Sequence, residues 1–217
     1  MYKFFFKRFL DLFISIVSLI LLFPIMIPII IILRFTGEGE IFYIQERMGY
    51  NNKKFKIFKF ATMIKNSSNI GTKSLTLRND PRVLPFGRIL RKTKINELPQ
   101  ILNVIIGDMS IVGPRPQMKV DFLVYPKYVQ KSIYSVKPGI TGINQIFFSD
   151  EEKIISKSKN PRKYYKEVIA PSKGKLELWY LDNVNFLTDT KIISITVLVI
   201  FFSNSKFISK FFKNLPV

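Results

Sequence analysis

The feature that most constrains the fold is an uncharged hydrophobic run near the N-terminus. The 22 residues from Leu12 to Leu33 include no charged side chain. A hydrocarbon core about 30 Å thick needs about 20 helical residues, so this run is long enough to span a bilayer. Pro24 and Pro28 interrupt it, and a central proline removes a backbone donor and kinks a helix. No small-residue cleavage site precedes Arg34, which argues against a cleaved signal peptide. We therefore expect a membrane-associated helix.

The residues themselves leave two arrangements of this helix open. Lys3, Lys7 and Arg8 precede the run, and Arg34 follows it. A kinked helix that spans the bilayer places one basic flank outside, against the positive-inside tendency, although long domains often ignore that tendency. A helix that bends at Pro24 and returns to the same face keeps both basic flanks in the cytoplasm.

Composition limits the chemistry and the partners of the chain. Its 217 residues carry a net charge of +19, 47% of them are hydrophobic, and Cys and His are absent. So much hydrophobic content excludes a wholly disordered chain, and so large a basic surface requires an anionic partner such as a phosphorylated substrate, acidic lipid or nucleic acid. Without His and Cys, catalysis depends on carboxylates, basic groups, hydroxyls or a hard metal such as magnesium.

Short elements follow the hydrophobic run. Apolar and polar residues alternate on either side of an Asn-rich turn in residues 41–60, which predicts a β-hairpin. Residues 65–73 are rich in Ser, Asn and Gly and should form a surface loop. Residues 88–91 are typical of a short amphipathic helix, and residues 113–116 and 138–142 of two tight turns.

A further helix is expected between Asn96 and Gly107. Asn96 is a favoured N-cap residue, Pro99 is tolerated in the first turn, and Gly107 suits the position after the last turn. Near the C-terminus, the apolar residues 191–202 are too few to span a bilayer, so core packing and an interfacial helix both explain them. Residues 206–213 alternate Lys with Phe and Ile, which suits a membrane surface. These patterns predict a mixed α/β domain that is rich in helix.

The best candidate site lies within residues 88–115. The N-terminus of a helix that begins at Asn96 presents free backbone N–H groups and the positive end of the helix dipole. A phosphate or diphosphate suits such a place, and Glu97 is available to hold a divalent cation. The basic side chains that we expect to converge there are Arg82, Arg88, Arg91, Lys92, Lys94 and Arg115. From spacing alone, a structural cap beside a solvated basic face explains the same residues.

A series of short motifs runs in order along nearly the whole chain. They are Lys7-Arg8-Phe9-Leu10-Asp11, Gln45-Glu46-Arg47-Met48-Gly49, Phe55-Lys56-Ile57-Phe58-Lys59-Phe60, Asp80-Pro81-Arg82, Gly87-Arg88, Leu90-Arg91-Lys92-Thr93, Glu97-Leu98-Pro99-Gln100, Asn103-Val104, Gly107-Asp108-Met109-Ser110, Val112-Gly113-Pro114-Arg115-Pro116, Pro138-Gly139-Ile140-Thr141-Gly142 and Trp179-Tyr180-Leu181-Asp182-Asn183. In this order the chain resembles the bacterial sugar transferases, which are monotopic phosphoglycosyl transferases that start glycan assembly on polyprenyl phosphate. Residues 144–173 match least, and we expect them to shape the sugar pocket.

The resemblance implies an architecture. Residues 1–36 would form a membrane anchor, a re-entrant helix bent near Pro24 with both ends in the cytoplasm. Residues 37–217 would form the catalytic domain on the cytoplasmic face of the bacterial inner membrane, with amphipathic helices, including C-terminal ones, at the interface. A homo-oligomer is left open.

The resemblance also implies a reaction and its residues. A sugar 1-phosphate would pass from a nucleoside-diphosphate sugar, usually a UDP-sugar, to polyprenyl phosphate, with magnesium as cofactor and UMP as by-product. Glu97 would be catalytic and hold the metal, Lys59 would be catalytic, and Glu177 would orient a basic residue. The expected phosphate and nucleotide contacts are Arg115, Arg88, Arg82 and Pro114.

The charge of the chain has two rival interpretations: a membrane protein that binds nucleic acid, and a purely structural membrane-surface protein. We expect no nucleic acid, because the aromatic residues lie mostly in apolar runs.

The chain departs from the family pattern at the position of its nucleophile. The family has an Asp-Glu pair before Leu-Pro-Gln, in which the Asp attacks phosphorus, whereas this chain has Asn96-Glu97. An amide offers no ionised oxygen for that attack. Smaller departures are Ala61, where an Arg is common, and Phe23, where a Ser precedes the bend.

Three explanations of Asn96 are open. Polyprenyl phosphate attacks directly while Asn96 stabilises charge, another carboxylate (Glu97, Asp108 or Glu177) is the nucleophile, or the protein is a catalytically silent, membrane-bound binding partner. The retained basic and acidic residues favour an active transferase, because phosphoryl transfer gains much of its acceleration from positioning and charge stabilisation.

Overall fold

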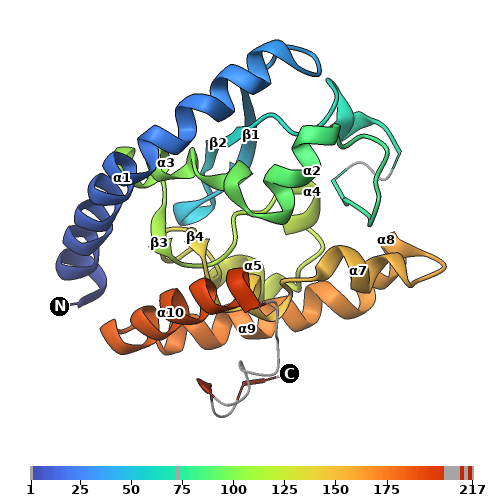
Figure 1. The fold of residues 1–217 in the computed structure, drawn as a ribbon. Helices are drawn as coiled ribbons and strands as arrows, with labels where there is room; N and C mark the ends of the chain where they lie inside the picture. The colour runs from blue at the N-terminus through green and yellow to red at the C-terminus, as the bar shows by residue number, and fades with distance from the viewer. Residues whose placement is uncertain (1, 72–73, 203–210, 213–214, 217) are drawn as a thin grey trace.

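The structure is a computed structural model that describes residues 2–71, 74–202, 211–212 and 215–216. In these residues the chain forms a helix-rich mixed α/β fold, as its patterns predicted (Figure 1). The helices are α1 (Lys7–Phe35), α2 (Pro85–Lys92), α3 (Gln100–Ile106), α4 (Lys119–Phe122), α5 (Lys127–Ser132), α6 (Ile143–Phe147), α7 (Glu151–Ser156), α8 (Pro161–Tyr164), α9 (Ala170–Asp182) and α10 (Phe186–Phe202). The strands are β1 (Phe42–Met48), β2 (Lys54–Phe60), β3 (Ser110–Val112) and β4 (Gly139–Thr141). The expected membrane-surface stretch at 206–213 lies outside the described residues, apart from 211 and 212.

Helix α1 is long and mostly apolar on its outer side. By length and composition it is able to cross a membrane. Met26, Ile29 and Leu33 on its inner side pack with Phe60 of β2 and Leu90 of α2. The helix changes direction along its length (Figure 1), and it contains both prolines. Its exposed apolar side chains are Phe9, Phe13, Ile16, Val17, Ile20, Leu21, Phe23, Ile25, Ile27, Ile31, Ile32 and Phe35.

Polar contacts attach the beginning of α1 to the same domain. Arg8 donates to the carbonyl oxygens of Val104 (2.6 Å) and Ile105 (3.0 Å), in the last turn of α3. These carbonyls have no partner within their own helix, so a guanidinium is well placed there. A carboxylate oxygen of Asp11 accepts from the backbone N–H of Ile111 in β3 (2.9 Å). Helix α1 therefore contacts the domain near both of its ends.

The strands form two small sheets. As predicted for residues 41–60, β1 and β2 form an antiparallel hairpin with Phe42 opposite Phe60. The pair β3 and β4 is parallel, with Ser110 beside Gly139. The tight turn expected at residues 138–142 is therefore wrong. Gly139 lies in a strand, where the lack of a side chain lets the two strand backbones approach closely. A β-carbon on Gly139 would lie 2.0 Å from the backbone nitrogen of Gly113.

The helix expected to begin at Asn96 begins later. Residues Ile95–Glu97 form one turn of 3₁₀ helix after Lys94, which has a left-handed φ of 61°. Pro99 has no N–H to bond the carbonyl of residue 95, so α-helical bonding cannot run through this turn. Helix α3 starts at Gln100, and Asn96 does not cap it. Gly107, with φ 106°, ends α3 as predicted.

Helices α9 and α10 lie together on the far side of β3 and β4 from α1 (Figure 1). Ile192 and Ile195 of α10 are buried with Leu176 and Tyr180 of α9. Core packing is therefore one confirmed role of residues 191–202, although the opposite side of α10 leaves apolar groups such as Val197 exposed.

Candidate active site

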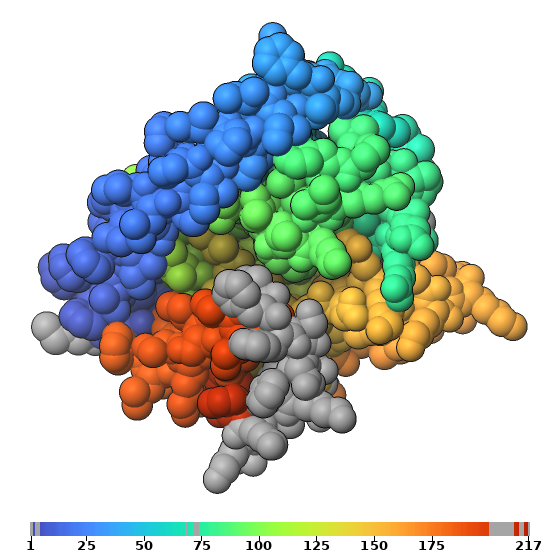
Figure 2. Space-filling view, viewed as in Figure 1, coloured from blue at the N-terminus to red at the C-terminus, as the bar shows by residue number. Residues whose placement is uncertain are grey.

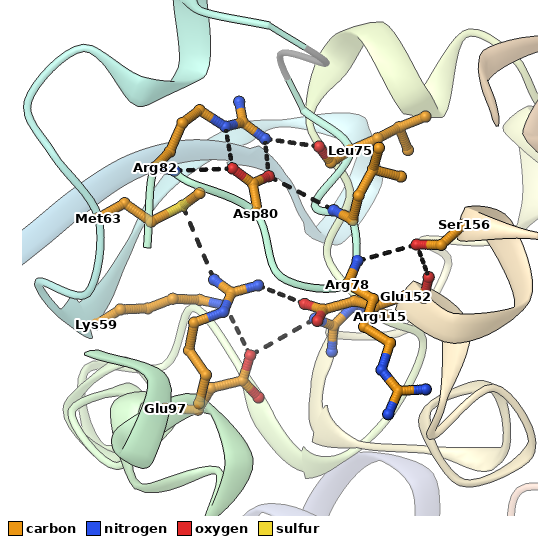
Figure 3. Close-up of polar contacts among 12 residues, drawn as sticks. Lys59, Met63, Leu75, Arg78, Asp80, Arg82, Glu97, Arg115, Glu152 and Ser156 are labelled. Carbon is orange, nitrogen blue, oxygen red and sulfur yellow. Dashed lines mark hydrogen bonds and ion pairs between the residues drawn. The ribbon is translucent and has the colours of Figure 1, made fainter. Parts of the chain in front are cut away.

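Three charged side chains from separate segments meet at one carboxylate oxygen. Oε1 of Glu97 lies 2.7 Å from Nζ of Lys59 and 3.5 Å from Nη2 of Arg115 (Figure 3). Lys59 comes from β2, Glu97 from the 3₁₀ turn before α3, and Arg115 from the segment after β3. The fold therefore brings together three residues that the motifs had predicted for one site.

Asn103 fixes the relative position of two of these segments. It is fully buried in α3, its Oδ1 accepts from the backbone N–H of Phe58 (3.0 Å), and its Nδ2 donates to the carbonyl of Lys56 (2.7 Å). Both partners belong to β2, next to Lys59. In the sequence, Asn103 stands out as an amide among the apolar residues of a predicted helix. Nothing in the sequence indicated which strand its side chain would bond.

The electrostatics of the cluster favour a charged Glu97. Burial works to raise the pKa of Glu97, but the positive charges of Lys59 and Arg115 outweigh it and hold that pKa far below its ordinary value. Burial lowers the pKa of Lys59 to about 8 against the opposing attraction of Glu97. Arg47, a partly buried residue of the cavity lining that sequence reasoning did not single out, adds a positive charge near Lys59. The site therefore has a surplus of positive charge, which suits phosphate groups.

A cavity of about 1000 Å³ contains this cluster. Ile14, Ser18 and Leu22 of α1 line one part, and Arg88 and Lys94 add further cationic groups. In the space-filling view a hollow opens between the blue and green segment above and the orange C-terminal helices below (Figure 2). A volume of this size is at the upper end of that found for small-molecule sites.

Asn96 lines the same cavity beside the charged cluster. It is 6% exposed, and its side-chain amide makes no hydrogen bond to any of the described residues. Its N–H donors are therefore available to a ligand. Pro114 lies in the backbone turn before Arg115, and its carbonyl accepts from the N–H of Gly139 (2.9 Å), which holds the Arg115 segment against β4.

The structure assigns Arg82 to a buried support rather than to the charged cluster. The guanidinium donates to both carboxylate oxygens of Asp80 and to the carbonyl of Leu75 (Figure 3). It also donates to the carbonyls of Ser67 and Ile70. These contacts occupy all five of its N–H donors. Arg82 therefore has no N–H donor left for a phosphate, and the phosphate contact expected of it is wrong. Arg88, by contrast, is exposed and lines the cavity.

Glu177 is completely buried in α9 and contacts Arg115 through the backbone. Its Oε1 accepts from the N–H of Arg115 (3.0 Å) and from Nδ2 of Asn144 (3.0 Å). Burial raises the pKa of Glu177 to about 7, although both hydrogen bonds oppose this. Lys173, one helical turn earlier, is also buried and donates to Oε1 of Glu151 (2.6 Å). Its spacing of four residues from Glu177 was the signal that sequence reasoning missed.

The acidic groups give limited support to a metal. The described residues include no group of three or more acidic or His side chains that could hold an ion. Glu97 offers Oε2, for which the described part of the chain supplies no hydrogen-bond donor. Magnesium is commonly held by one or two carboxylates together with substrate phosphates, so Glu97 fits such an ion only when a diphosphate is bound. Asp108 is not among the described residues that line the cavity.

The chain is similar to known sugar transferases over most of its length. The family model described as bacterial sugar transferase matches residues 2–203. The chain is 32% identical over 198 residues to the exopolysaccharide production protein PSS of Rhizobium leguminosarum bv. phaseoli, covering 88% of this chain and 92% of that protein. It is 36% identical over 193 residues to the uncharacterized sugar transferase EpsL of Bacillus subtilis, covering 88% and 85%.

A longer relative has a more specific name. The chain is 33% identical over 205 residues to the UDP-glucose:undecaprenyl-phosphate glucose-1-phosphate transferase of Klebsiella pneumoniae. This match covers 93% of the chain and 41% of that protein. Because the family model and the full-length relatives match nearly the whole chain, the protein belongs to the bacterial sugar transferase family, as its motifs predicted.

Proposed function

We propose that this protein transfers a sugar 1-phosphate from a UDP-sugar to polyprenyl phosphate, as the first membrane step of glycan or polysaccharide assembly. The observation that carries the proposal is the cavity in which Asn96 lies beside the Lys59–Glu97–Arg115 cluster and which also reaches α1. A site of this kind offers cationic groups to a diphosphate and an apolar flank to a lipid chain.

The family and the names of its members make the chain a phosphoglycosyl transferase. Relatives from Klebsiella pneumoniae and Komagataeibacter xylinus are named for transfer of glucose phosphate to undecaprenyl phosphate. Because the chain spans only 41% and 37% of these two proteins, the identity of its donor and acceptor is part of the proposal.

The reaction needs few chemical groups from the protein. An oxygen of polyprenyl phosphate bonds to the β-phosphorus of the UDP-sugar, and the bond from that phosphorus to the bridging oxygen breaks. UMP leaves with the bridging oxygen, and the product is polyprenyl-diphosphate sugar. Arg115, Lys59 and the cavity-lining Arg88 stabilise negative charge on the phosphates, which is the main contribution that proteins make to phosphoryl transfer.

Glu97 has two tasks in this scheme. It holds Lys59 and Arg115 in position, and its Oε2 is the group that would hold magnesium together with the diphosphate. A bound magnesium ion supplies further neutralisation of phosphate charge. Glu97→Gln is expected to lower UMP release at least about 100-fold. A variant with full turnover would refute the metal and positioning roles.

We further propose that polyprenyl phosphate attacks directly, with the Asn96 amide donating hydrogen bonds to the transferring phosphate. Glu177 is a poor nucleophile because one oxygen is bonded and the other is buried, and Asp108 is not a described lining residue of the cavity. The amide of Asn96 has no competing hydrogen bond among the described residues.

UMP release in detergent or nanodiscs tests the function and the mechanism together. Wild-type protein, magnesium, undecaprenyl phosphate and a panel of UDP-sugars should yield UMP only when all components are present. Asn96→Asp is compared with Asn185→Asp, an exposed site outside the cavity whose side-chain oxygen caps α10. Wild-type inactivity across the panel, rescued by Asn96→Asp alone, would support the silent-partner alternative. A phosphosugar adduct on the wild type, detected by mass spectrometry, would refute direct attack.

The membrane arrangement is proposed from the contacts of α1. Residues 1–36 form the anchor and residues 37–217 the catalytic domain, with both ends of the anchor on the cytoplasmic face. Arg8 and Asp11 near one end of α1, and Leu33 near the other, all contact the same domain. A helix held at both ends by one domain is difficult to reconcile with a straight crossing.

The absence of native cysteine allows a clean topology test. Single cysteines are added before Met1 and after Val217, and labelled with an impermeant maleimide in intact cells and in lysed cells. Both should be labelled only after lysis. Labelling of either cysteine alone in intact cells would refute the re-entrant arrangement.

A further inference from the structure

A group of buried polar atoms beside Arg115 has no partner among the described residues. Its members are Oε2 of Glu177, Oδ1 of Asn144, and both Oε1 and Nε2 of Gln145. Glu177 is completely buried and Asn144 is 1% exposed. Buried polar atoms are nearly always hydrogen-bonded, and leaving one unpaired is destabilising. So many unpaired atoms in one region indicate that something else completes them.

These side chains gather around one segment of backbone. Glu177 accepts from the N–H of Arg115, and Asn144 donates to the same oxygen of Glu177. A β-carbon on Gly142 would stand 2.9 Å from Oε1 of Gln145 and 2.3 Å from the carbonyl oxygen of Gly113. Both amides therefore lie near residues 113–115. Asn144 and Gln145 line the large cavity, and they come from α6.

Arg115 separates two regions of different chemistry. Its guanidinium faces Glu97 in the cationic region, whereas its backbone N–H faces Glu177 in the region of the two amides. A phosphate is attracted to the first region and repelled from a carboxylate in the second. The unpaired polar atoms of the second region are the amide oxygens of Asn144 and Gln145, the amide nitrogen of Gln145 and the deeper Oε2 of Glu177.

A sugar hydroxyl fits this second region. Each hydroxyl donates one hydrogen bond and accepts others, so it is able to satisfy a carboxylate or carbonyl oxygen and an amide N–H at once. In a UDP-sugar the hydroxyl groups follow directly after the β-phosphate. With the diphosphate at Lys59 and Arg115, the sugar would extend toward residues 144 and 145, which line the cavity.

We propose that Asn144 and Gln145, with Asn144 held in place by the buried Glu177, form the subsite that binds and selects the sugar of the donor through its hydroxyl groups. The inference rests on the proposed function and assigns the sugar end of the substrate to this part of the cavity. The carboxylate orients both the Arg115 backbone and the Asn144 amide, and the two amides read the positions of the hydroxyls.

Binding rather than turnover is the sharpest test, because it does not depend on the role of Asn96. Affinities are measured by calorimetry for UDP and for UDP-glucose, UDP-galactose, UDP-N-acetylglucosamine and UDP-N-acetylgalactosamine. Variants Asn144→Ala and Gln145→Ala are compared with wild type. Glu167→Gln, at an exposed position outside the cavity lining, is the control for handling and detergent.

The expected result is that one UDP-sugar binds wild type most tightly and loses about 10-fold or more in each variant, while the affinity for UDP changes less than about twofold. Retained UDP binding also shows that the variants are folded. Gln145→Ala is informative here because its amide makes no hydrogen bond to the described residues that the substitution would break.

A cycle with monodeoxy analogues of the preferred UDP-sugar identifies the hydroxyl. Removing the hydroxyl that Gln145 contacts should weaken binding to wild type but not further weaken binding to Gln145→Ala. If both variants bind every UDP-sugar as wild type does, the unpaired atoms hold structural water only and the inference is overturned. UMP release measured on the same samples reports separately on the proposed function.

Discussion

Replacing Glu177 by Gln should make the stability of the protein less dependent on pH. Glu177 is completely buried, and burial raises its pKa to about 7 from an ordinary value of 4.5. Folding therefore favours the protonated carboxyl group. The stabilisation is fully present below pH 4.5 and is lost as the pH rises through 7. Glutamine has no proton to lose, and its side-chain oxygen is able to keep the bonds from Arg115 and Asn144.

The size of the effect follows from the two pKa values. At about 1.4 kcal/mol per pH unit, the raised pKa of Glu177 lowers the free energy of unfolding by about 1 kcal/mol at pH 5 and about 3 kcal/mol at pH 8, relative to a group that stays uncharged in both states. For a chain of this length, 1 kcal/mol corresponds to roughly 2–4 °C in Tm. The variant should therefore melt about 2–4 °C above wild type at pH 5 and roughly 6–12 °C above it at pH 8.

Thermal unfolding in the same detergent at pH 5 and pH 8, without nucleotide, measures this difference. Glu167→Gln, which removes an exposed carboxyl group, should shift Tm by the same small amount at both pH values. If the gain for Glu177→Gln were equal at pH 5 and pH 8, Glu177 would not be the titrating group and the reasoning from its burial would be wrong.

The remaining predictions concern a buried pair, a backbone contact and the charged cluster. Arg82→Met leaves Asp80 buried and unpaired, so the free energy of unfolding, measured by denaturant titration, should fall by roughly 3–5 kcal/mol. If a folded Arg82→Lys variant lost affinity for UDP, the purely structural role of Arg82 would be contradicted. Gly139→Ala puts a methyl group 2.0 Å from the nitrogen of Gly113, so Tm should fall by at least about 5 °C, and an unchanged Tm would contradict the β3–β4 pairing. Because burial lowers the pKa of Lys59 to about 8, kcat/KM for UMP release should decline as the pH rises through about 8, and Lys59→Arg should remove that decline. A wild-type pH profile that stays flat to pH 10 would contradict a role for the charged amine.

Elements that depend on local pattern were predicted correctly. The alternation in residues 41–60 is sufficient to specify a hairpin, and Gly107 ends α3 because glycine adopts the left-handed conformation without strain. Two local predictions failed for different reasons. Gly139 lies in a strand because Gly113, distant in the sequence, packs directly against it. Asn96 lies before α3 because Pro99, three residues later, interrupts the helical hydrogen bonds, a local effect that outweighs the N-cap preference of Asn96.

The candidate site divides in the same way. The resemblance to the family implied that Lys59, Glu97 and Arg115 belong to one site, and the fold brings them to one carboxylate oxygen. The resemblance also implied a phosphate contact by Arg82, but the donors of Arg82 are occupied by Asp80 and by backbone carbonyls. Asp80 lies only two residues before Arg82, whereas folding brings the carbonyls of Ser67 and Ile70 to the same guanidinium, so local and distant partners together leave it no free donor.

Charge, hydropathy and motif order in the amino-acid chain were enough to indicate a membrane anchor, a family and an unusual amide at the nucleophile position. Tertiary contacts decided the placement of Asn144 beside Glu177 and the attachment of α1 to one domain near both of its ends. The physical reason is that residue type and spacing act over a few positions. Burial and hydrogen-bond pairing depend on neighbours dozens of residues away, and these set the pKa of Glu177 and the unpaired atoms beside it.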